Sequence, residues 1–561
     1  MLGSVLRPYL PARRDRIYLP LVVLACVLFL LYLQPNRPSY GYPLSRAIVH
    51  QEGATSDGLI TSASLAQLAL PRFDKLLKSR ILDYDSSLAL ESIRCPHTHL
   101  QSNRDQLANE GEHVWPTMTV RQLQDARDKV IERVKERFGW SVREDAGKSA
   151  SELDEMLGTS GRGLVFTAGN KDTTSRLLTS LRILRKRHGC TLPVEIFAYP
   201  SEMQALRDVK TSIDELGGVT WREAQSVRAD GAWKSFGIKG DAIARSSFSE
   251  VLYLDSDNVP LVDPTFLFDS PTYQKHGIVL WPDFNRDSAA NPVWRLLSHP
   301  CSPEAAWQAE SGQLLVDKRA RGGLNLVALE VARAMMEEEA FWFRLSGGDK
   351  DTFRFAFFLL SLPYSMAPLY PSALGGPRLG RPYRGHTFCG HTMLQHGLDG
   401  SREWDLLRKQ GKVADDFVPD RLGEARDFVP PPPLFVHANV LKHTGYALKR
   451  GATFKTVKRP RDARLAPHAA AARASWFGSL RHAAAPALES IRQAGLPTQG
   501  ICVDVWDAAA VDGAGEKVED APAGAYEAGE VEVSAWEDEW GGLARGFEEM
   551  YYDEGGVAGA W

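Results

Sequence analysis

The chain has 561 residues, of which 44% are hydrophobic and 24% are charged, a composition normal for a globular protein that could hold more than one domain. Six cysteines occur without any CxxC pair, which excludes a zinc module built from paired cysteines. The net charge of −4 is unevenly spread, because residues 503–561 contain 16 Asp or Glu against Lys517 and Arg545. Residues 1–502 therefore carry +10 (−4 minus −14), which is compatible with an anionic ligand such as a nucleotide diphosphate. Nucleic-acid binding is not expected.

An uncharged hydrophobic segment runs from Ile17 to Leu33. As a helix it would be about 25 Å long, close to the roughly 30 Å of a bilayer core, and tyrosines lie near both of its ends. Basic residues are more frequent before it than after it, which predicts a cytoplasmic N-terminus. A cleaved signal peptide is the alternative, but residues 34–36 offer no small-x-small cleavage site. We predict a cytoplasmic tail at 1–16, a single-pass signal anchor at 17–33 and a lumenal remainder.

An oxidising lumen would allow one or two disulfides among the scattered cysteines. Residues 34–157 are interpreted as a stem followed by a helical region that spaces the catalytic part from the membrane and packs against it. Its clearest helix is predicted from Val120 to Phe138, where Leu123, Val130 and Val134 lie on one side.

Short apolar stretches then alternate with helical ones. Strands are predicted at 163–169, 194–198, 219–221 and 251–254, with helical segments between them. This alternation predicts an α/β fold with a mostly parallel sheet. The sequence lacks GxGxxG and GxxxxGK[ST], so neither a dinucleotide-binding enzyme nor a P-loop enzyme is supported.

Asp255-Ser256-Asp257 follows the last of these strands directly, and Pro260 ends the segment. Acidic side chains at the carboxyl end of a buried strand lie where open α/β sheets bind ligands. Two carboxylates one residue apart suit a hard divalent cation that also binds diphosphate oxygens. A solvated turn after a core strand is the alternative interpretation.

Further polar and aromatic segments follow in a fixed order. They are Trp281-Pro282-Asp283, Glu310-Ser311-Gly312-Gln313, Gly348-Asp349-Lys350-Asp351-Thr352-Phe353, and His437-Ala438-Asn439 with Lys442. Together with the Asp-Ser-Asp stretch, they resemble the fungal Golgi α-mannosyltransferases of glycosyltransferase family 71, over about residues 160 to 446. The resemblance implies a type II Golgi membrane enzyme with a GT-A fold. It also implies GDP-mannose as donor, Mn²⁺ as cofactor, a mannose-containing glycan as acceptor, and other Golgi mannosyltransferases as partners.

The resemblance also assigns roles to residues. Asp257, Asp255 and His437 would bind the metal, and Asp255 could instead contact the ribose. Lys239 and Lys442 would neutralise the diphosphate, with Trp281 and Asp283 also placed in the donor site. A carboxylate near the sugar would stabilise an oxocarbenium-like state or orient the acceptor. The candidates for that role are Glu310, Asp349 and Asp351. Because donor and product are both α-linked, configuration is retained.

Two features depart from the family pattern. Gly237-Ile238-Lys239-Gly240-Asp241 places glycines and an acid around the lysine. A long acidic, Gly-rich tail follows the expected catalytic domain of residues 158–450, and residues 451–561 are predicted to be disordered. A UDP-sugar-dependent retaining transferase and a non-catalytic membrane scaffold remain as alternative functions.

Overall fold

The computed structural model describes residues 60–95, 106–140, 155–203, 206–226, 236–376, 386–419, 428–438, 450, 453–460, 502–506, 526–527 and 531–557. All of them belong to the compact unit Leu59–Trp561. The predicted tail and anchor at 1–33 lie outside the described residues. Within the described part, no helix combines the length and the apolar character needed to cross a membrane.

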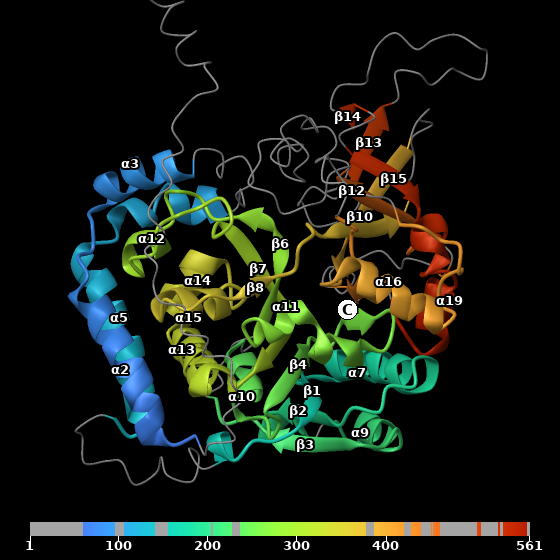
Figure 1. The fold of residues 1–561 in the computed structure, drawn as a ribbon, viewed down its shortest axis with the longest axis horizontal. Coiled ribbons are helices and arrows are strands. Elements are labelled where there is room, and N and C mark those ends of the chain that lie inside the picture. The colour runs from blue at the N-terminus through green and yellow to red at the C-terminus, as the bar shows by residue number, and fades with distance from the viewer. Residues whose placement is uncertain are drawn as a thin grey trace, which may run out of the picture. The chain divides into compact units, whose positions relative to one another are not determined.

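The helical region comes first in the described chain (Figure 1). It comprises α2 (Ser62–Lys78), α3 (Tyr84–Arg94), η2 (Leu107–Gly111), η3 (Trp115–Thr117) and α5 (Val120–Arg137). The helix predicted from Val120 is confirmed, and its predicted apolar side is buried. Both α2 and α5 pack against α13 (Leu324–Glu337). Arg137 of α5 forms an ion pair with the fully buried Glu330 at 3.0 Å, which adds charge complementarity to this contact.

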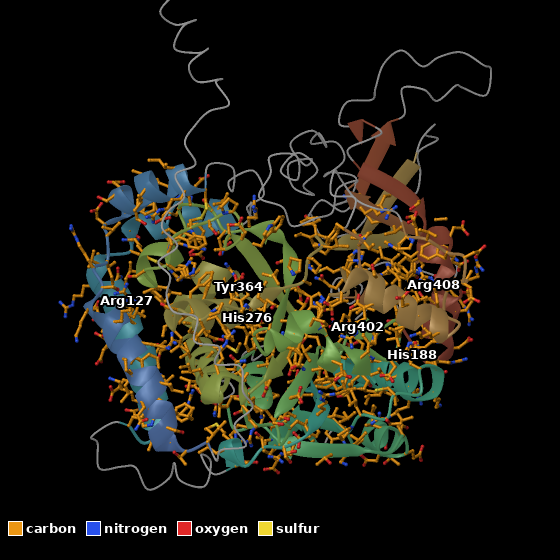
Figure 2. The ribbon with its side chains drawn as sticks, in the orientation of Figure 1. Arg127, His188, His276, Tyr364, Arg402 and Arg408 are labelled. Atoms are coloured by element: carbon orange, nitrogen blue, oxygen red, sulfur yellow. A yellow bond between two sulfur atoms is a disulfide. The ribbon has the colours of Figure 1, made fainter. Side chains whose placement is uncertain are left out.

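Two further links join the helical region to the rest of the unit. Arg127 of α5 is fully buried and donates hydrogen bonds to backbone carbonyls that include those of Leu76, Arg295 and Leu296 (Figure 2). A disulfide joins Cys95 to Cys301, so one of the expected disulfides is confirmed. The helical region therefore forms part of the same packed structure as the sheet.

A seven-stranded sheet forms the centre of the unit, in the order β3-β2-β1-β4-β7-β6-β8. Its strands are β1 (Arg162–Thr167), β2 (Val194–Ala198), β3 (Val219–Glu223), β4 (Glu250–Leu254), β6 (Ile278–Arg286), β7 (Trp307–Asp317) and β8 (Ser365–Met366). Only β7 runs antiparallel to its neighbours. The predicted α/β class with a mostly parallel sheet is confirmed.

Helices connect the strands and pack beside them. Those of the first half are α7 (Lys171–Arg182), η5 (Ile183–Arg187), α8 (Pro200–Met203), α9 (Arg207–Asp214) and α10 (Gly237–Arg245). Those that follow are η7 (Pro264–Asp269), α11 (Pro271–Gln274), α12 (Val293–Leu296), η8 (Ala320–Gly323), α14 (Glu339–Ser346) and α15 (Thr352–Leu359). Gly240 allows α10 to approach α13 closely, because a Cβ there would lie 2.9 Å from Met336 Sδ. Asp241 is buried beside Arg333 of α13 at 3.0 Å. The departures from the family pattern around Lys239 thus follow from helix packing.

A second sheet follows the order β14-β13-β10-β9-β12-β15, and β11 joins it by pairing with both β10 and β5. Its strands are β5 (Asn258–Pro260), β9 (Ser372–Gly376), β10 (His386–His396), β11 (Pro433–His437), β12 (Thr456–Pro460), β13 (Cys502–Trp506), β14 (Tyr526–Glu527) and β15 (Val531–Ala535), and α16 (Gly400–Lys409) follows β10. Because β5 comes directly after Asp257, this sheet is joined to the carboxyl end of β4.

The prediction of a disordered tail at 451–561 is wrong for the described parts of that tail. β12 pairs with β9 and β15, and η11 (Trp536–Gly542) and α19 (Phe547–Asp553) follow (Figure 1). Trp536, Phe547 and Tyr551 are buried in the same hydrophobic cluster as residues of β1 and β4. Low aliphatic content was a misleading signal, because a few aromatic side chains bury a large apolar area each.

Two buried acidic residues of this tail are paired with cations. Glu554 lies 2.6 Å from Arg187 at the end of η5, and the buried Glu548 lies 3.1 Å from Lys455. The first of these ion pairs joins the tail to the basic body, and the second lies within residues 451–561, so both offset part of the negative charge of the tail.

Candidate active site

The Asp-Ser-Asp stretch is fixed by hydrogen bonds to the neighbouring strand β7. The Asp255 backbone N–H donates to the carbonyl of Gly312 at 2.9 Å. The Asn258 side chain donates to the same carbonyl at 2.8 Å and to the Gln313 side chain at 2.7 Å. The chain therefore turns at the end of β4 with both carboxylates held close to β7.

His437 reaches this turn through the second sheet. In the β5–β11 pair it lies opposite Asn258, and the Ala438 N–H donates to the Asp257 carbonyl at 2.9 Å. His437 Nε2 lies 3.3 Å from Asp257 Oδ1 and 3.8 Å from Asp255 Oδ2. One potential ligand atom from each of the three residues lies within 4.8 Å of the others. The predicted metal ligands are brought together across about 180 residues of sequence.

The Glu310-Ser311-Gly312 segment of β7 supports His437 from the other side. Glu310 Oε1 lies 3.1 Å from His437 Nδ1 and accepts a hydrogen bond from the Gly312 N–H at 2.7 Å. A Cβ at position 312 would lie 2.5 Å from the imidazole, so only glycine leaves room for His437 in this position. The Nδ1 contact leaves Nε2 directed at the two aspartates, an arrangement typical of histidines that bind metals.

Lys239 of α10 joins two of the predicted carboxylates. Its buried ammonium lies 3.2 Å from Asp255 Oδ1 and 3.0 Å from Asp349 Oδ2, and donates to Ser311 Oγ at 2.8 Å. Tyr253 donates to Asp255 Oδ1 at 2.7 Å and contacts the Thr167 hydroxyl at 2.9 Å. Asp255 is thus oriented from two sides, and Asp349 shares its lysine.

The charges of His437 and Glu310 stabilise each other. Burial lowers the pKa of His437, but the carboxylates of Glu310 and Asp257 outweigh it and raise the pKa to about 10. Burial raises the pKa of Glu310, but the His437 charge outweighs it and lowers the pKa to about 2. Burial also lowers the pKa of Lys239, whereas Asp255 and then Asp349 raise it well above its ordinary value. Without a metal, the imidazole therefore carries the compensating positive charge.

The donor set fits a divalent cation. Asp255, Asp257, Glu310 and Asp349 supply four carboxylates, against which the cluster holds Lys239 and the protonatable His437. Asp255 and Asp257 offer hard oxygen atoms, and His437 offers one nitrogen, a combination that Mn²⁺ accepts. The side chain of Asp255 is 23% exposed, whereas those of Asp257 and His437 are 5% and 4% exposed. A metal here would be reached from the Asp255 side.

The other predicted residues lie in different surroundings. Trp281 is fully buried, donates from its indole N–H to the His396 carbonyl at 2.8 Å and packs edge-on against Phe435. Asp283 forms an ion pair with Lys350. Asp351 is fully buried and accepts hydrogen bonds from the Ala309 N–H at 2.8 Å and from Arg354 at 2.9 Å. Trp281 lies opposite Glu310 in the β6–β7 pair, whereas Asp283 and Asp351 form ion pairs with Lys350 and Arg354. Lys442 lies outside the described residues.

Sequence reasoning missed four residues that hold the site together: Tyr253, Asn258, Ser311 and Gly312. Ser311 and Gly312 stand within the quoted motifs, and the residue types of Asn258 and Gly312 carried a signal. A polar Asn258 directly after two aspartates, and a glycine inside the buried strand β7, both indicate a special backbone approach. Tyr253 gave no such signal, because tyrosine is a common residue in β-strands.

Comparisons with known proteins agree with the motif resemblance. Residues 161–294 and 299–397 match the family model described as "Mannosyltransferase putative". An α-1,2-mannosyltransferase of Candida albicans is 48% identical over 64 residues, covering 11% of each chain. A second from Candida albicans is 26% identical over 246 residues (36% of this chain and 34% of the relative). One from Saccharomyces cerevisiae is 28% identical over 168 residues (29% and 25%).

Two solved structures show low similarity. Mouse xyloside xylosyltransferase 1 matches with a TM-score of 0.26 and 12% identity, covering 37% of this chain and 85% of its own. The galactosyltransferase LgtC matches with a TM-score of 0.23 and 12% identity, covering 37% and 73%. The fold is therefore assigned from its own strand order.

The match to the curated relatives is partial. The chain spans between 11% and 34% of the length of the first three. All three are α-1,2-mannosyltransferases. The two ranges that match the family model, 161–294 and 299–397, include the Asp-Ser-Asp turn and the strand β7 beside it. Residues 161–294 and 299–397 are therefore similar to this mannosyltransferase family, in agreement with the resemblance of the sequence motifs.

Proposed function

We propose that this protein is a retaining α-mannosyltransferase of GT-A type that transfers mannose from GDP-mannose to mannose-containing glycans and uses Mn²⁺. The observation that carries the proposal is the convergence of Asp255, Asp257 and His437 at the carboxyl end of β4. The mostly parallel sheet and the family of the matched residues support it. The relatives' names favour α-1,2 linkage.

In this proposal each residue has a definite task. Asp257, His437 and Asp255 hold the metal, which when bound stabilises negative charge on the departing diphosphate as a Lewis acid. Lys239 holds the carboxylates of Asp255 and Asp349 in place, since its ammonium contacts both. Asp349 is the carboxylate best suited to face the sugar or the acceptor hydroxyl, because Asp351 is bound by Arg354. Glu310 orients His437.

The wider setting is proposed from the sequence. Residues 17–33 would anchor the protein in the Golgi membrane as a single-pass type II protein, with the catalytic unit in the lumen beside other mannosyltransferases. Microscopy of a fluorescently tagged full chain, combined with protease protection of the tag in isolated vesicles, tests both the compartment and the orientation.

The activity is tested with the full chain purified in detergent. Release of GDP from GDP-mannose is measured with a mannobiose acceptor, before and after metal removal by EDTA and after Mn²⁺ is added back. We expect turnover that disappears with EDTA and returns with Mn²⁺, and an α-linked product. Turnover of UDP-sugars in place of GDP-mannose would support the UDP-sugar alternative. A folded protein that turns over no donor would support the scaffold alternative.

A further inference from the structure

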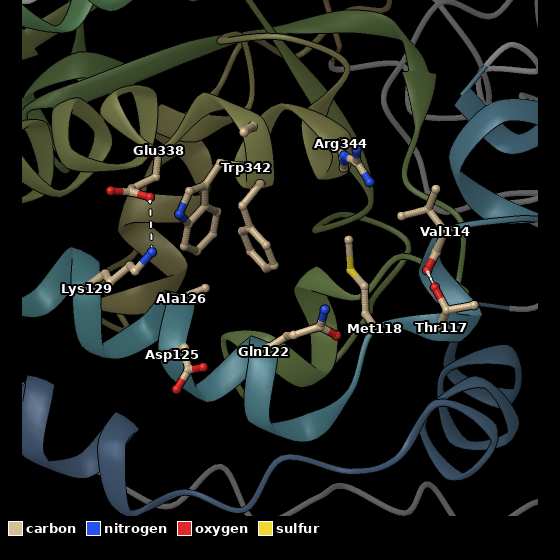
Figure 3. Close-up of a pocket in the computed structure, with 12 residues that line it drawn as sticks. Val114, Thr117, Met118, Gln122, Asp125, Ala126, Lys129, Glu338, Trp342 and Arg344 are labelled. Carbon is tan, nitrogen blue, oxygen red and sulfur yellow. Dashed lines mark hydrogen bonds and ion pairs between the residues drawn. The ribbon is translucent and has the colours of Figure 1, made fainter.

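A cavity of about 430 Å³ lies between the helical region and α14, and none of its lining residues belongs to the metal-site cluster (Figure 3). Its apolar lining includes Met118, Ala126, Phe341 and Trp342. Phe341 and Trp342 also pack edge-to-face, with their ring centroids 5.5 Å apart. Ligand sites of this size typically combine aromatic walls with a few polar groups. The cavity thus suits a small ligand with an apolar face.

Charged residues at the cavity balance one another. Asp125 and Glu338 supply two acids, and Lys129 and Arg344 supply two bases. Lys129 Nζ lies 3.6 Å from Glu338 Oε2, as the dashed line in Figure 3 shows. A nucleotide or another anion would need an excess of positive charge, which these residues do not offer. The lining therefore favours a neutral ligand with many hydroxyl groups.

Trp342 supplies an independent indication. Its side chain is fully buried, yet its indole N–H has no hydrogen-bond acceptor in the described part of the chain. Figure 3 shows the indole nitrogen pointing toward the pair formed by Lys129 and Glu338, both of which line the cavity. Buried donors are nearly always paired, because an unpaired one costs free energy. A hydroxyl group entering at that end would provide the acceptor.

The cavity is also linked to the candidate active site along the chain. Arg344 lines it, and α14 ends at Ser346, followed by Gly347 and Gly348 with positive φ and then by Asp349. Asp349 is five positions after Arg344 in the chain, which limits the distance between their Cα atoms to about 18 Å. A ligand that reaches from the cavity towards the active site would therefore be an oligomer.

We infer that this cavity is a second carbohydrate-binding site, which holds a remote unit of a neutral oligosaccharide acceptor. The apolar C–H face of a pyranose would lie on Phe341 and Met118, while its hydroxyl groups would bind Asp125 and the indole N–H of Trp342. The inference rests on the proposed function, because the glycan acceptor comes from it. Binding at this site is nevertheless measurable without any turnover.

The test measures binding of α-1,2-linked mannotriose to the full chain in detergent by saturation-transfer NMR. Trp342→Phe removes the N–H and keeps most of the packing, and Asp125→Asn removes one rim charge. Asp128→Asn is the matched control, since Asp128 is an exposed acid on the same helix that does not line the cavity. We expect Kd to rise about five-fold in each of the two cavity variants, as for the loss of one hydrogen bond, and to stay unchanged in the control.

Kinetics separate this site from the catalytic one. The cavity variants should raise KM for mannotriose without changing kcat. Their KM for methyl α-mannoside should also stay unchanged, because a monosaccharide cannot reach both sites. Absence of mannotriose binding to the wild-type chain, or wild-type affinity in Asp125→Asn, would overturn the inference, even if Trp342→Phe fails to fold. Failure of the proposed function would instead appear as absent GDP release while mannotriose still binds.

Discussion

Two clusters of carboxylates flank the same stretch of β7, and they differ in how their charge is balanced. The open cluster contains Asp255, Asp257 and Glu310 around His437. The closed cluster contains Asp287 and Asp351, both paired with Arg354, and the side chains of all three are fully buried. The guanidinium of Arg354 balances the negative charge of the closed cluster. The open cluster holds more carboxylates than permanent cations and is partly accessible, which is what a metal site requires.

The comparison shows that an acidic motif does not reveal its role by spacing alone. Asp349 and Asp351 stand two residues apart in the same motif, yet Asp349 contacts Lys239 of the open cluster and Asp351 contacts Arg354 of the closed one. Burial raises the pKa of Asp351 to about 6, against the opposing effect of Arg354. The closed cluster therefore depends on its arginine to keep a buried carboxylate charged.

The largest effect is expected from Asp257→Ala in the open cluster. Donor turnover should fall by at least about 10³-fold, or roughly 4 kcal/mol, because the metal would no longer be held beside the diphosphate. The melting temperature should change little, since the metal-free cluster is rich in negative charge. GDP release and thermal unfolding are measured on one preparation. A loss of activity that only tracks the folded fraction would contradict the metal-site assignment.

Asp351→Asn in the closed cluster should show the opposite pattern. Removing one partner of a buried ion pair leaves Arg354 under-compensated, so the free energy of unfolding should fall by about 3 kcal/mol. Turnover per folded molecule should stay within a few-fold of wild type. Urea unfolding and active-site-normalised kinetics test this, with Asp405→Asn, an exposed acid on α16, as control. Unchanged stability with lost turnover would restore Asp351 to the catalytic group.

The contrast between the two clusters also explains which features of the fold and the site could be predicted from the sequence. The alternating strands and the Asp-Ser-Asp turn were predictable because both depend on local pattern. His437 came from the family resemblance, since nothing local distinguishes it from a packed histidine; β5–β11 pairing brings it to the site. The surroundings of Asp351 and Trp281 were not predictable, because they depend on the burial of Arg354 and on the packing of Phe435 from another strand. The folded tail was missed for the same reason: Trp536 and Glu548 find their partners elsewhere in the chain.

His437→Ala sharpens the comparison within the open cluster. Loss of one of three ligands should weaken Mn²⁺ binding about 10- to 100-fold, and excess Mn²⁺ should restore part of the turnover. Asp257→Ala should be rescued far less, because it also removes a negative charge. Calorimetric titration of Mn²⁺ into the metal-free protein measures the affinity directly. An unchanged Mn²⁺ affinity in a well-folded His437→Ala protein would remove this residue from the metal site.

A pH series tests the same histidine without a mutation. The pKa of His437 is raised in the metal-free fold to about 10, so its charge adds stability below its ordinary pKa of about 6.5. That contribution should be lost as pH rises from about 6.5 through about 10. Because a metal binds the neutral imidazole, Mn²⁺ affinity should increase by up to about tenfold per pH unit in that range. A His437→Gln protein should lose both the pH dependence of stability and the pH dependence of Mn²⁺ affinity. If either pH dependence persists, it belongs to another titrating group.

The smallest effect is expected from Glu310→Gln, which distinguishes two roles for this carboxylate. Glu310 contacts His437 Nδ1 at 3.1 Å, and a glutamine oxygen could still accept from that nitrogen. If Glu310 orients the histidine, Mn²⁺ affinity should fall less than about 10-fold, and kcat at saturating Mn²⁺ should remain near wild type. Glu310→Ala removes the acceptor as well and should weaken Mn²⁺ binding further. If Glu310 instead stabilises positive charge on the sugar, its negative charge is needed for catalysis. Glu310→Gln should then leave the Mn²⁺ affinity unchanged and reduce kcat about 100-fold. Measuring both constants for both variants therefore decides whether Glu310 acts on the histidine or on the substrate.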